Sequence, residues 1–390
     1  MARAAPAAAC GMIRENASRE GAGALRVTTT EPGQTLMLDD LDYELPPELI
    51  AQQPLATRDA SRLLVLHRTA GRVEDRTFGD LPVLLSPGDI LVRNDTRVFP
   101  ARCFFRRATG GRIEVLFLRS AGHGDEGEIW EALLRGRPRL GEVLACETAS
   151  EWPLRCEKSL GDGRWLLTSL ALAPVLELLD AVGVTPLPPY IHAPLEDAER
   201  YQTSYARAVG SAAAPTAGLH FTPALDAELR DAGVALETVT LHVGLGTFKP
   251  LQTEALTARR LHSEAYEVDA GVWARLLAAR AQGRRVIAVG TTSMRTLEHL
   301  ARVAPTPAAN GAADPSAAGS VLRGDTSLFI TPGFEMRMVG GLVTNFHLPR
   351  TSLLALVMAF CGVAETRRLY AHAVRERYRF YSLGDAMLAL

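Results

Sequence analysis

Histidine, asparagine and hydroxyl side chains gather in five short segments that are otherwise rich in small residues. His220 and His347 lie in two of them and are candidates for a general acid or base near neutral pH. A histidine bonded only to backbone carbonyls is the commoner case and stays open as the alternative for each. Because α/β enzymes hold ligands in the turns after their strands, such turns together predict one composite pocket. The segments are 213–221 (AAPTAGLHF), 240–248 (TLHVGLGTF), 290–295 (GTTSMR), 324–330 (GDTSLFI) and 341–352 (GLVTNFHLPRTS).

The third segment follows a β-type run and opens a predicted helix. Thr291, Ser293 and Arg295 stand in its first turns. A helix N-terminus presents free N–H groups and partial positive charge, so this turn suits a carboxylate or a phosphate. Ordinary capping of the helix by a hydroxyl is the commoner outcome and stays open.

The first segment contains the run Pro-Thr-Ala-Gly, in which Thr216 and Gly218 offer little bulk to an approaching flat ligand. The second contains Gly244-Leu245-Gly246, which resembles half of a glycine-rich phosphate loop. The third glycine and the following acidic residue are missing, so we interpret these glycines as close backbone packing and not as a dinucleotide site.

The histidines do not show the spacing of a metal site. The sequence has no H-E-x-x-H motif and no short ligand pair on one helical turn. We therefore expect no metal. A metal-dependent hydrolase remains an alternative, because a carboxylate could complete a site in three dimensions around His220, His242, His262 and His347.

Arginines are concentrated in one stretch of a chain whose formal net charge is only −2. Asp95 and Glu114 are the acidic residues between them. A locally basic face can hold a polyanion, whereas outward-facing arginines on a strand are the plainer interpretation. A non-catalytic RNA-binding module is thus a further alternative. The stretch contains Arg93, Arg97, Arg102, Arg106, Arg107, Arg112 and Arg119.

Cysteine usage and hydropathy indicate the compartment. The five cysteines are odd in number and show no C-x-x-C spacing, which fits a reducing cytoplasm. No apolar run approaches the roughly 20 residues of a membrane helix, so we expect no membrane association. Residues 1–36 are Ala-rich without a continuous apolar stretch, and we predict a disordered N-terminal extension.

The periodicity predicts an α/β fold with a small β-barrel inserted into it. Regular structure resumes as α/β after residue 170, with a helix from Pro223 capped by Thr222 and a buried strand at 286–289. The α/β domain therefore comprises 37–97 and 171–390, with a disordered Ala/Pro-rich insertion at about 304–320, and the barrel comprises 98–170. Its predicted strands are 101–105, 112–118, 128–134, 152–156 and 164–170.

Twelve ordered blocks between Asp42 and Met387 give the chain a close resemblance to one family. It resembles the S-adenosylmethionine:tRNA ribosyltransferase-isomerases of queuosine biosynthesis. So many blocks in register make accidental similarity implausible. They are YELPPELIAQQP, RNDTRVFPAR, GGRIEVL, PLPPYI, RYQTSY, AAPTAGLHF, TLHVGLGTF, LHSE, VIAVGTTSMRTLE, GDTSLFITPGF, LVTNFHLP and YRFYSLGDAM.

The resemblance implies an α/β domain carrying an inserted barrel, and it implies the reaction. S-adenosylmethionine, a substrate and not a cofactor, donates its ribosyl group to 7-aminomethyl-7-deazaguanine at the wobble position of a tRNA. The sugar rearranges to give epoxyqueuosine, and methionine and adenine leave. We expect a cytoplasmic monomer whose partners are that tRNA and S-adenosylmethionine.

The chemistry of this reaction suggests roles for the candidate residues. It needs a base and an acid with tuned pKa values, for which His220 and His347 are our hypothesis. Asp325 is a candidate for the ribose hydroxyls, and Thr291, Ser293 and Arg295 for the methionine carboxylate. The remaining predicted substrate-binding residues are Thr216, Gly218 and Asn345, and the predicted tRNA-binding residues are Arg93, Arg97, Arg102, Arg106 and Arg107.

Overall fold

The computed structural model describes residues 36–188, 190–193, 195, 197–244, 251, 256, 258, 260–304 and 320–390. The predicted disordered extension (1–36) and insertion (about 304–320) lie outside the described residues, apart from their border residues. Among the described residues, no helix is both long enough and apolar enough to cross a membrane.

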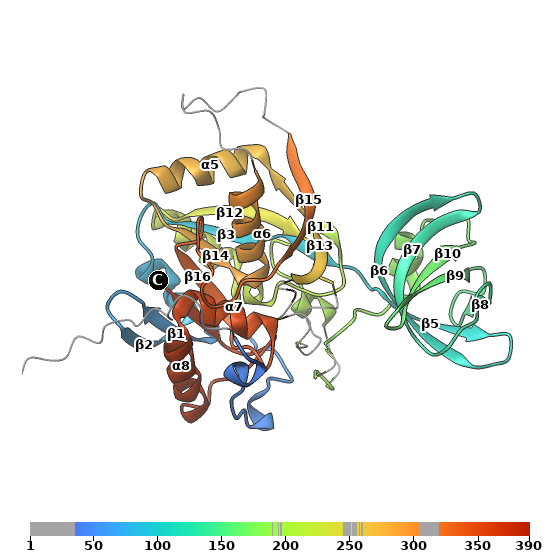
Figure 1. The fold of residues 1–390 in the computed structure, drawn as a ribbon, viewed down its shortest axis with the longest axis horizontal. Coiled ribbons are helices and arrows are strands. Elements are labelled where there is room, and N and C mark those ends of the chain that lie inside the picture. Colours follow the sequence, from blue (N-terminus) through green and yellow to red (C-terminus); the bar gives the residue numbers. More distant parts are fainter. Residues whose placement is uncertain are drawn as a thin grey trace, which may run out of the picture.

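A nine-stranded mixed sheet forms the larger part of the described molecule (Figure 1). Its strands β12, β3, β14 and β16 run parallel to one another, and antiparallel neighbours extend the sheet on both sides. The strand order is β15 (Val321–Leu328), β13 (Arg260–Asp269), β12 (Ala235–Leu241), β3 (Ile90–Asn94), β14 (Val286–Val289), β16 (Gly341–Asn345), β17 (Ala386–Ala389), β1 (Arg62–His67) and β2 (Arg72–Thr77).

Helices cover both faces of this sheet, so its central strands are buried throughout. Each face of the sheet has its own hydrophobic core, and alternate residues of β1 point into different ones. Leu64 and Leu66 belong to the first core, and Leu63 and Val65 belong to the second. The first core is closed by α5 (Ala270–Ala281), α6 (Gly290–Val303), α7 (Ser352–Cys361) and α8 (Val363–Arg375). The second is closed by the short α1 (Leu81–Leu84) and by α3 (Pro223–Asp231).

The smaller part is a closed barrel of six antiparallel strands, which lies beside the main sheet (Figure 1). Its own core contains Phe105, Phe117, Trp130 and Trp152, all buried. Helix α2 (Val175–Val182) adds Val175 and Leu179 to that core. The strands are β5 (Arg102–Arg107), β6 (Arg112–Gly124), β7 (Gly127–Arg135), β8 (Val143–Cys146), β9 (Pro153–Gly161) and β10 (Arg164–Ser169).

The chain enters and leaves the barrel region through two paired strands. β4 (Thr96–Val98) leads out of β3, and β11 (Ala208–Ser211) returns and pairs with β4 in parallel. The expected combination of a mixed α/β sheet with a separate antiparallel barrel is therefore confirmed. The predicted domain limits at 97/98 and 170/171 stay a prediction, and α2 packs with the barrel although it was assigned to the α/β part.

Local capping signals correspond to the observed helix starts. α3 begins at Pro223, and the Thr222 hydroxyl accepts a hydrogen bond from the backbone N–H of Leu225 at 3.1 Å, as predicted. Single turns of 3₁₀ helix fill the connections. They are η1 (Leu38–Leu41), η2 (Pro47–Leu49), η3 (Arg58–Ala60), η4 (Phe78–Asp80), η5 (Ala198–Tyr201) and η6 (Thr216–His220).

Candidate active site

The four parallel strands of the main sheet bring their carboxyl ends to one edge, and a pocket of about 490 Å³ lies there. Thr216, Thr291, Asn345 and His347, predicted from three different segments, all line it. Ligands of α/β sheets bind at this edge because the turns after the strands are free to carry polar side chains. The other lining residues are Ala214, Pro215, Ala217, Val243, Gly290, Thr292, Thr344, Leu353, Tyr381 and Ser382.

A chain of hydrogen bonds ties His220 to this pocket. The Thr216 hydroxyl donates to Asn345 Oδ1 at 2.9 Å, and Asn345 Nδ2 lies 3.2 Å from His220 Nε2. His220 Nδ1 in turn lies 2.8 Å from the Ser61 hydroxyl. Since the amide nitrogen can only donate, Nε2 must accept, and the ring proton sits on Nδ1 and points to Ser61.

His220 is buried and stays neutral. Its ring stacks on Phe78 with 4.8 Å between ring centroids. Burial is the main cause that lowers the pKa of His220 to about 4. The histidine therefore carries no charge near neutral pH, and it lies in an adjoining hollow that shares Ser382 with the pocket.

His347 enters the same pocket from the turn after β16. Its Nε2 lies 2.9 Å from the Thr344 hydroxyl, and its Nδ1 is buried without a hydrogen-bond partner among the described residues. A buried nitrogen left unpaired costs free energy, so it is a natural contact for a ligand. Burial lowers the pKa of His347 to about 3.

The N-terminus of α6 borders the pocket through Gly290 and Thr291. No side chain caps this end of the helix within the described structure, so the expected alternative of hydroxyl capping does not describe it. The Ser293 hydroxyl donates back to the Val289 carbonyl at 2.8 Å and is fully buried. Of the three predicted residues Thr291, Ser293 and Arg295, it is Thr291 that lines the pocket.

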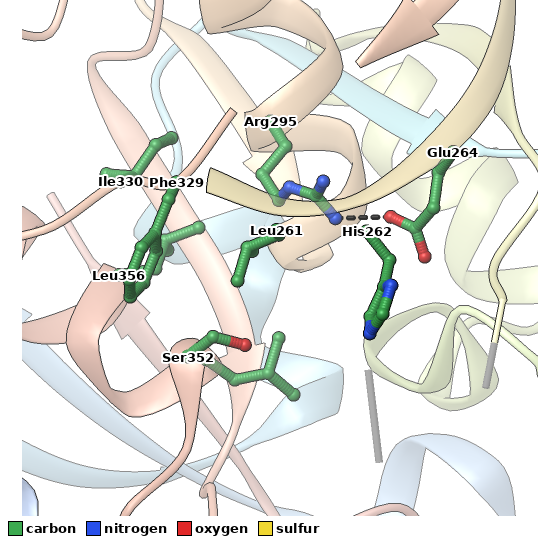
Figure 2. A pocket seen from close by; sticks show the side chains of 9 residues that line it. Leu261, His262, Glu264, Arg295, Phe329, Ile330, Ser352 and Leu356 are labelled. Atoms are coloured by element: carbon green, nitrogen blue, oxygen red, sulfur yellow. Dashed lines mark hydrogen bonds and ion pairs between the residues drawn. The ribbon is translucent and has the colours of Figure 1, made fainter. Parts of the chain in front are cut away.

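Arg295 lies in a second hollow beside the pocket, which Figure 2 shows from close by. Its guanidinium forms an ion pair with Glu264, and its Nε donates to the Leu328 carbonyl at 3.0 Å. The two hollows share Leu353. Apolar side chains line much of the rest of this hollow, namely Leu261, Phe329, Ile330, Leu353 and Leu356.

Three predicted substrate-binding residues lie outside the described hollows: Gly218, Asp325 and the buried Ser293. Gly218 is buried in η6, where a Cβ atom would overlap the Tyr205 hydroxyl and lie 2.8 Å from Thr203 Cγ2. Internal packing therefore accounts for this glycine. Asp325 is exposed on β15, opposite Ala265. Their proposed roles stay predictions.

The predicted tRNA-binding arginines do not form one open basic face. Arg93 is buried: it lies 2.7 Å from Asp226 and stacks over the Tyr205 ring, so in this arrangement it offers nothing to a phosphate. We assign it a structural role in place of the predicted one. The other four are at least partly exposed and each is paired with a glutamate: Arg97 with Glu199, Arg102 with Glu114, Arg106 with Glu147, and Arg107 with Glu142. Their contacts with tRNA stay predictions.

Sequence reasoning missed several residues around the pocket. Thr292 accepts from Asn94 at 3.3 Å, Thr344 holds His347, and Ser61 holds His220. Thr292 and Thr344 lay inside segments that had been singled out. No local signal marked Ser61, because it comes from a connection 159 residues away from its partner.

The four histidines considered for a hydrolase do not gather at one place: His220 and His347 lie at the pocket and its adjoining hollow, and His242 and His262 line a separate one. Among the described residues, no group of three His, Cys, Asp or Glu side chains has the geometry to hold a metal ion. His242 is bonded through Nδ1 to the Thr96 hydroxyl at 2.9 Å, separately from His220 and His347. The hydrolase alternative therefore has no geometric support in the described part of the chain.

Together, the fold and the pocket define an α/β protein with a ligand pocket at the carboxyl edge of its sheet and two neutral histidines beside it. The sequence profile of the queuosine biosynthesis protein family matches residues 38–389. The chain therefore belongs to that family.

Relatives match over nearly their whole length. An S-adenosylmethionine:tRNA ribosyltransferase-isomerase of Anaeromyxobacter sp. is 50% identical over 90% of this chain and 99% of its own. The protein of the same description from Desulforamulus reducens is 46% identical over 91% and 100%. The crystal structure of the S-adenosylmethionine tRNA ribosyltransferase from Thermotoga maritima has 37% identity and a TM-score of 0.51, covering 90% of this chain and all of that one.

Proposed function

We propose that this protein is an S-adenosylmethionine:tRNA ribosyltransferase-isomerase. It transfers the ribosyl group of S-adenosylmethionine to 7-aminomethyl-7-deazaguanine at the wobble position of tRNA, giving epoxyqueuosine with release of methionine and adenine. The observation that carries the proposal is the match to relatives of that description over their full length. An RNA-binding module without catalysis would not explain a pocket of hydroxyls and histidines outside the barrel.

The neutral histidines suit the proton transfers of this reaction. The sulfonium makes hydrogens on the adjacent carbon acidic, so a base is needed beside it, and the departing adenine needs a proton. With pKa values of about 4 and 3, His220 and His347 are unprotonated near pH 7. A histidine in this site therefore becomes an acid only after it has taken a proton from the substrates, which couples the two transfers.

The pocket supports a placement for S-adenosylmethionine. The uncapped N-terminus of α6 and Thr291 provide for its carboxylate. Thr216 already donates its proton to Asn345, so its oxygen accepts a hydrogen bond from a ligand amino group. Arg295 contributes through its ion pair with Glu264, which fixes the wall of the adjoining hollow. Asp325 stays the proposed partner of the ribose hydroxyls, and its contact with S-adenosylmethionine has to be measured directly.

Release of adenine tests the proposal. Incubation of the protein with S-adenosylmethionine and tRNA bearing the aminomethyl base should yield adenine and methionine in equal amounts, and tRNA lacking that base should yield neither. His347→Ala should lower turnover by roughly 10²–10⁴-fold, as expected for loss of a general acid or base, with an unchanged circular dichroism spectrum. Absence of adenine from the wild-type reaction would overturn the proposed function.

We further propose that the protein acts as a monomer in the cytoplasm. Both substrates are cytoplasmic molecules. The four described cysteines, Cys103, Cys146, Cys156 and Cys361, are free and buried, and burial raises the pKa of the Cys361 thiol to about 12, which suits a reducing compartment. Light scattering of the purified protein tests the oligomeric state.

A further inference from the structure

A separate hollow of about 990 Å³ lies between the barrel and the main sheet. Barrel strands β6, β7 and β10 form one wall, and β6 lies on the side of the barrel that faces the sheet (Figure 1). The turn after β12 and the start of β13 form the other. The hollow shares Val243 with the pocket of the candidate active site, so a strand of RNA held in the hollow would lie next to the reacting groups.

Two arginines on the barrel wall of this hollow share one carboxylate. Arg119 Nε lies 2.9 Å from Glu131 Oε2, and Arg164 Nη1 lies 3.1 Å from Glu131 Oε1. The Glu131 side chain is only 7% exposed, whereas those of Arg119 and Arg164 are 62% and 37% exposed. A buried carboxylate thus holds one edge of each guanidinium, and the remaining N–H groups are left for solvent or a ligand.

The charges around the hollow leave a net positive balance. Two guanidinium groups face one carboxylate on the barrel wall. On the opposite wall, Glu264 is neutralised by its ion pair with Arg295 and also accepts from the backbone N–H of Gly244 at 3.0 Å. Burial lowers the pKa of His242, so that ring adds no charge near neutral pH.

We propose that Arg119 and Arg164, held in place by Glu131, bind a backbone phosphate of the tRNA beside the wobble nucleotide. The inference rests on the proposed function, because it places the strand that carries the reacting base. Each guanidinium presents a planar fork of N–H donors that matches phosphate oxygens, and the shared carboxylate fixes two such groups beside each other. Fixing them beforehand also reduces the entropy lost on binding.

Arg112 provides a matched control on the same strand. It too is about half exposed, at 55%, and its Nε lies 3.1 Å from a glutamate, Glu147. It does not line the hollow. A general basic face on the barrel would lose as much from removal of Arg112 as from removal of Arg119, whereas a defined phosphate site would not.

The experiment compares Arg119→Gln, Arg164→Gln and Arg112→Gln. Binding of an anticodon stem-loop RNA is measured over a series of salt concentrations, together with binding of S-adenosylmethionine. Each of the first two changes should weaken RNA binding about tenfold and reduce the slope of log affinity against log salt by about 1. Arg112→Gln should behave as wild type, and Arg119→Lys should retain the salt slope, since it keeps the charge.

Two results would overturn the inference. One is wild-type RNA affinity and salt slope in both Arg119→Gln and Arg164→Gln. The other is an equal loss in Arg112→Gln, which would indicate diffuse attraction. Neither is confused with failure of the proposed function, which shows as absence of adenine release by the wild-type protein. Unchanged S-adenosylmethionine affinity in all variants excludes a general loss of folding.

Discussion

The amide nitrogen of Asn345 lies 3.2 Å from Nε2 of His220, across the boundary between two hollows. The same amide accepts from Thr216 through its oxygen at 2.9 Å. One side chain therefore sets two properties of the site at once. It selects the tautomer of His220, and it turns the Thr216 hydroxyl so that its lone pairs face the pocket.

Asn345→Ala should lower turnover more than it lowers stability. Loss of the amide frees the His220 ring and the Thr216 hydroxyl to reorient, and misplacement of this kind costs roughly 100-fold in rate. Adenine release at saturating substrate measures the loss, and thermal unfolding serves as the control. Full turnover of Asn345→Ala, in which His220 and Thr216 are both still present, would show that the amide does not position these two side chains.

The buried histidines should make stability depend on pH in a defined window. Unfolded histidine titrates near pH 6.5, whereas His220 and His347 have pKa values of about 4 and 3 in the folded protein. Between these values the unfolded chain binds more protons, so stability is complete above about pH 6.5 and is lost as the pH falls toward 4. Each histidine contributes about 1.4 kcal/mol per pH unit within the window.

Urea unfolding between pH 7.5 and pH 5 measures this dependence. His220→Gln removes one of the two groups and should reduce the slope of unfolding free energy against pH between 6.5 and 5. A slope in this variant equal to that of wild type would mean that His220 titrates normally in the folded protein.

Asp226→Asn should destabilise the protein strongly without weakening RNA binding. The change leaves the Arg93 guanidinium buried without its charge partner, which costs about 3–5 kcal/mol in a side chain only 5% exposed. Chemical unfolding and stem-loop RNA binding are measured on the same preparation. A clear loss of RNA affinity in the still-folded variant would restore Arg93 as a phosphate contact.

Gly218→Ala should be harmful, and Tyr205→Phe should relieve part of the harm. An added Cβ would overlap the Tyr205 hydroxyl, and that hydroxyl is buried without a hydrogen-bond partner in the described structure. Its removal makes room at little cost. Unfolding free energies of the two single variants and the double variant measure the coupling between the sites. Strictly additive effects would show that the clash lies elsewhere.

Periodicity and capping signals were sufficient for much of the fold. The strand at 286–289 and the helix after Thr222 were predicted closely, because a buried apolar run and a hydroxyl–proline pair depend on local physics. β8 was missed, since a strand of four residues with alternating burial carries little signal. The attachment of α2 to the barrel core is a tertiary choice that its own sequence does not specify.

The part of the candidate site that lies in turns at one edge of the main sheet could be predicted from the sequence. Thr291, Asn345 and His347 could be expected together, because β14 and β16 are parallel and end at a common edge. Thr216 follows β11, which lies outside the main sheet, so this argument does not place it. Arginine roles were not predictable in the same way. Charge along the sequence does not show which guanidinium meets a carboxylate, and Arg93 finds Asp226 from 133 residues away.

The pairing of β4 with β11 has a consequence for the independence of the barrel. Since the outgoing and returning strands lie side by side, the whole barrel occupies the position of a single loop in the topology of the main sheet. A segment whose two ends lie side by side in this way can be inserted or removed with little change to the scaffold around it.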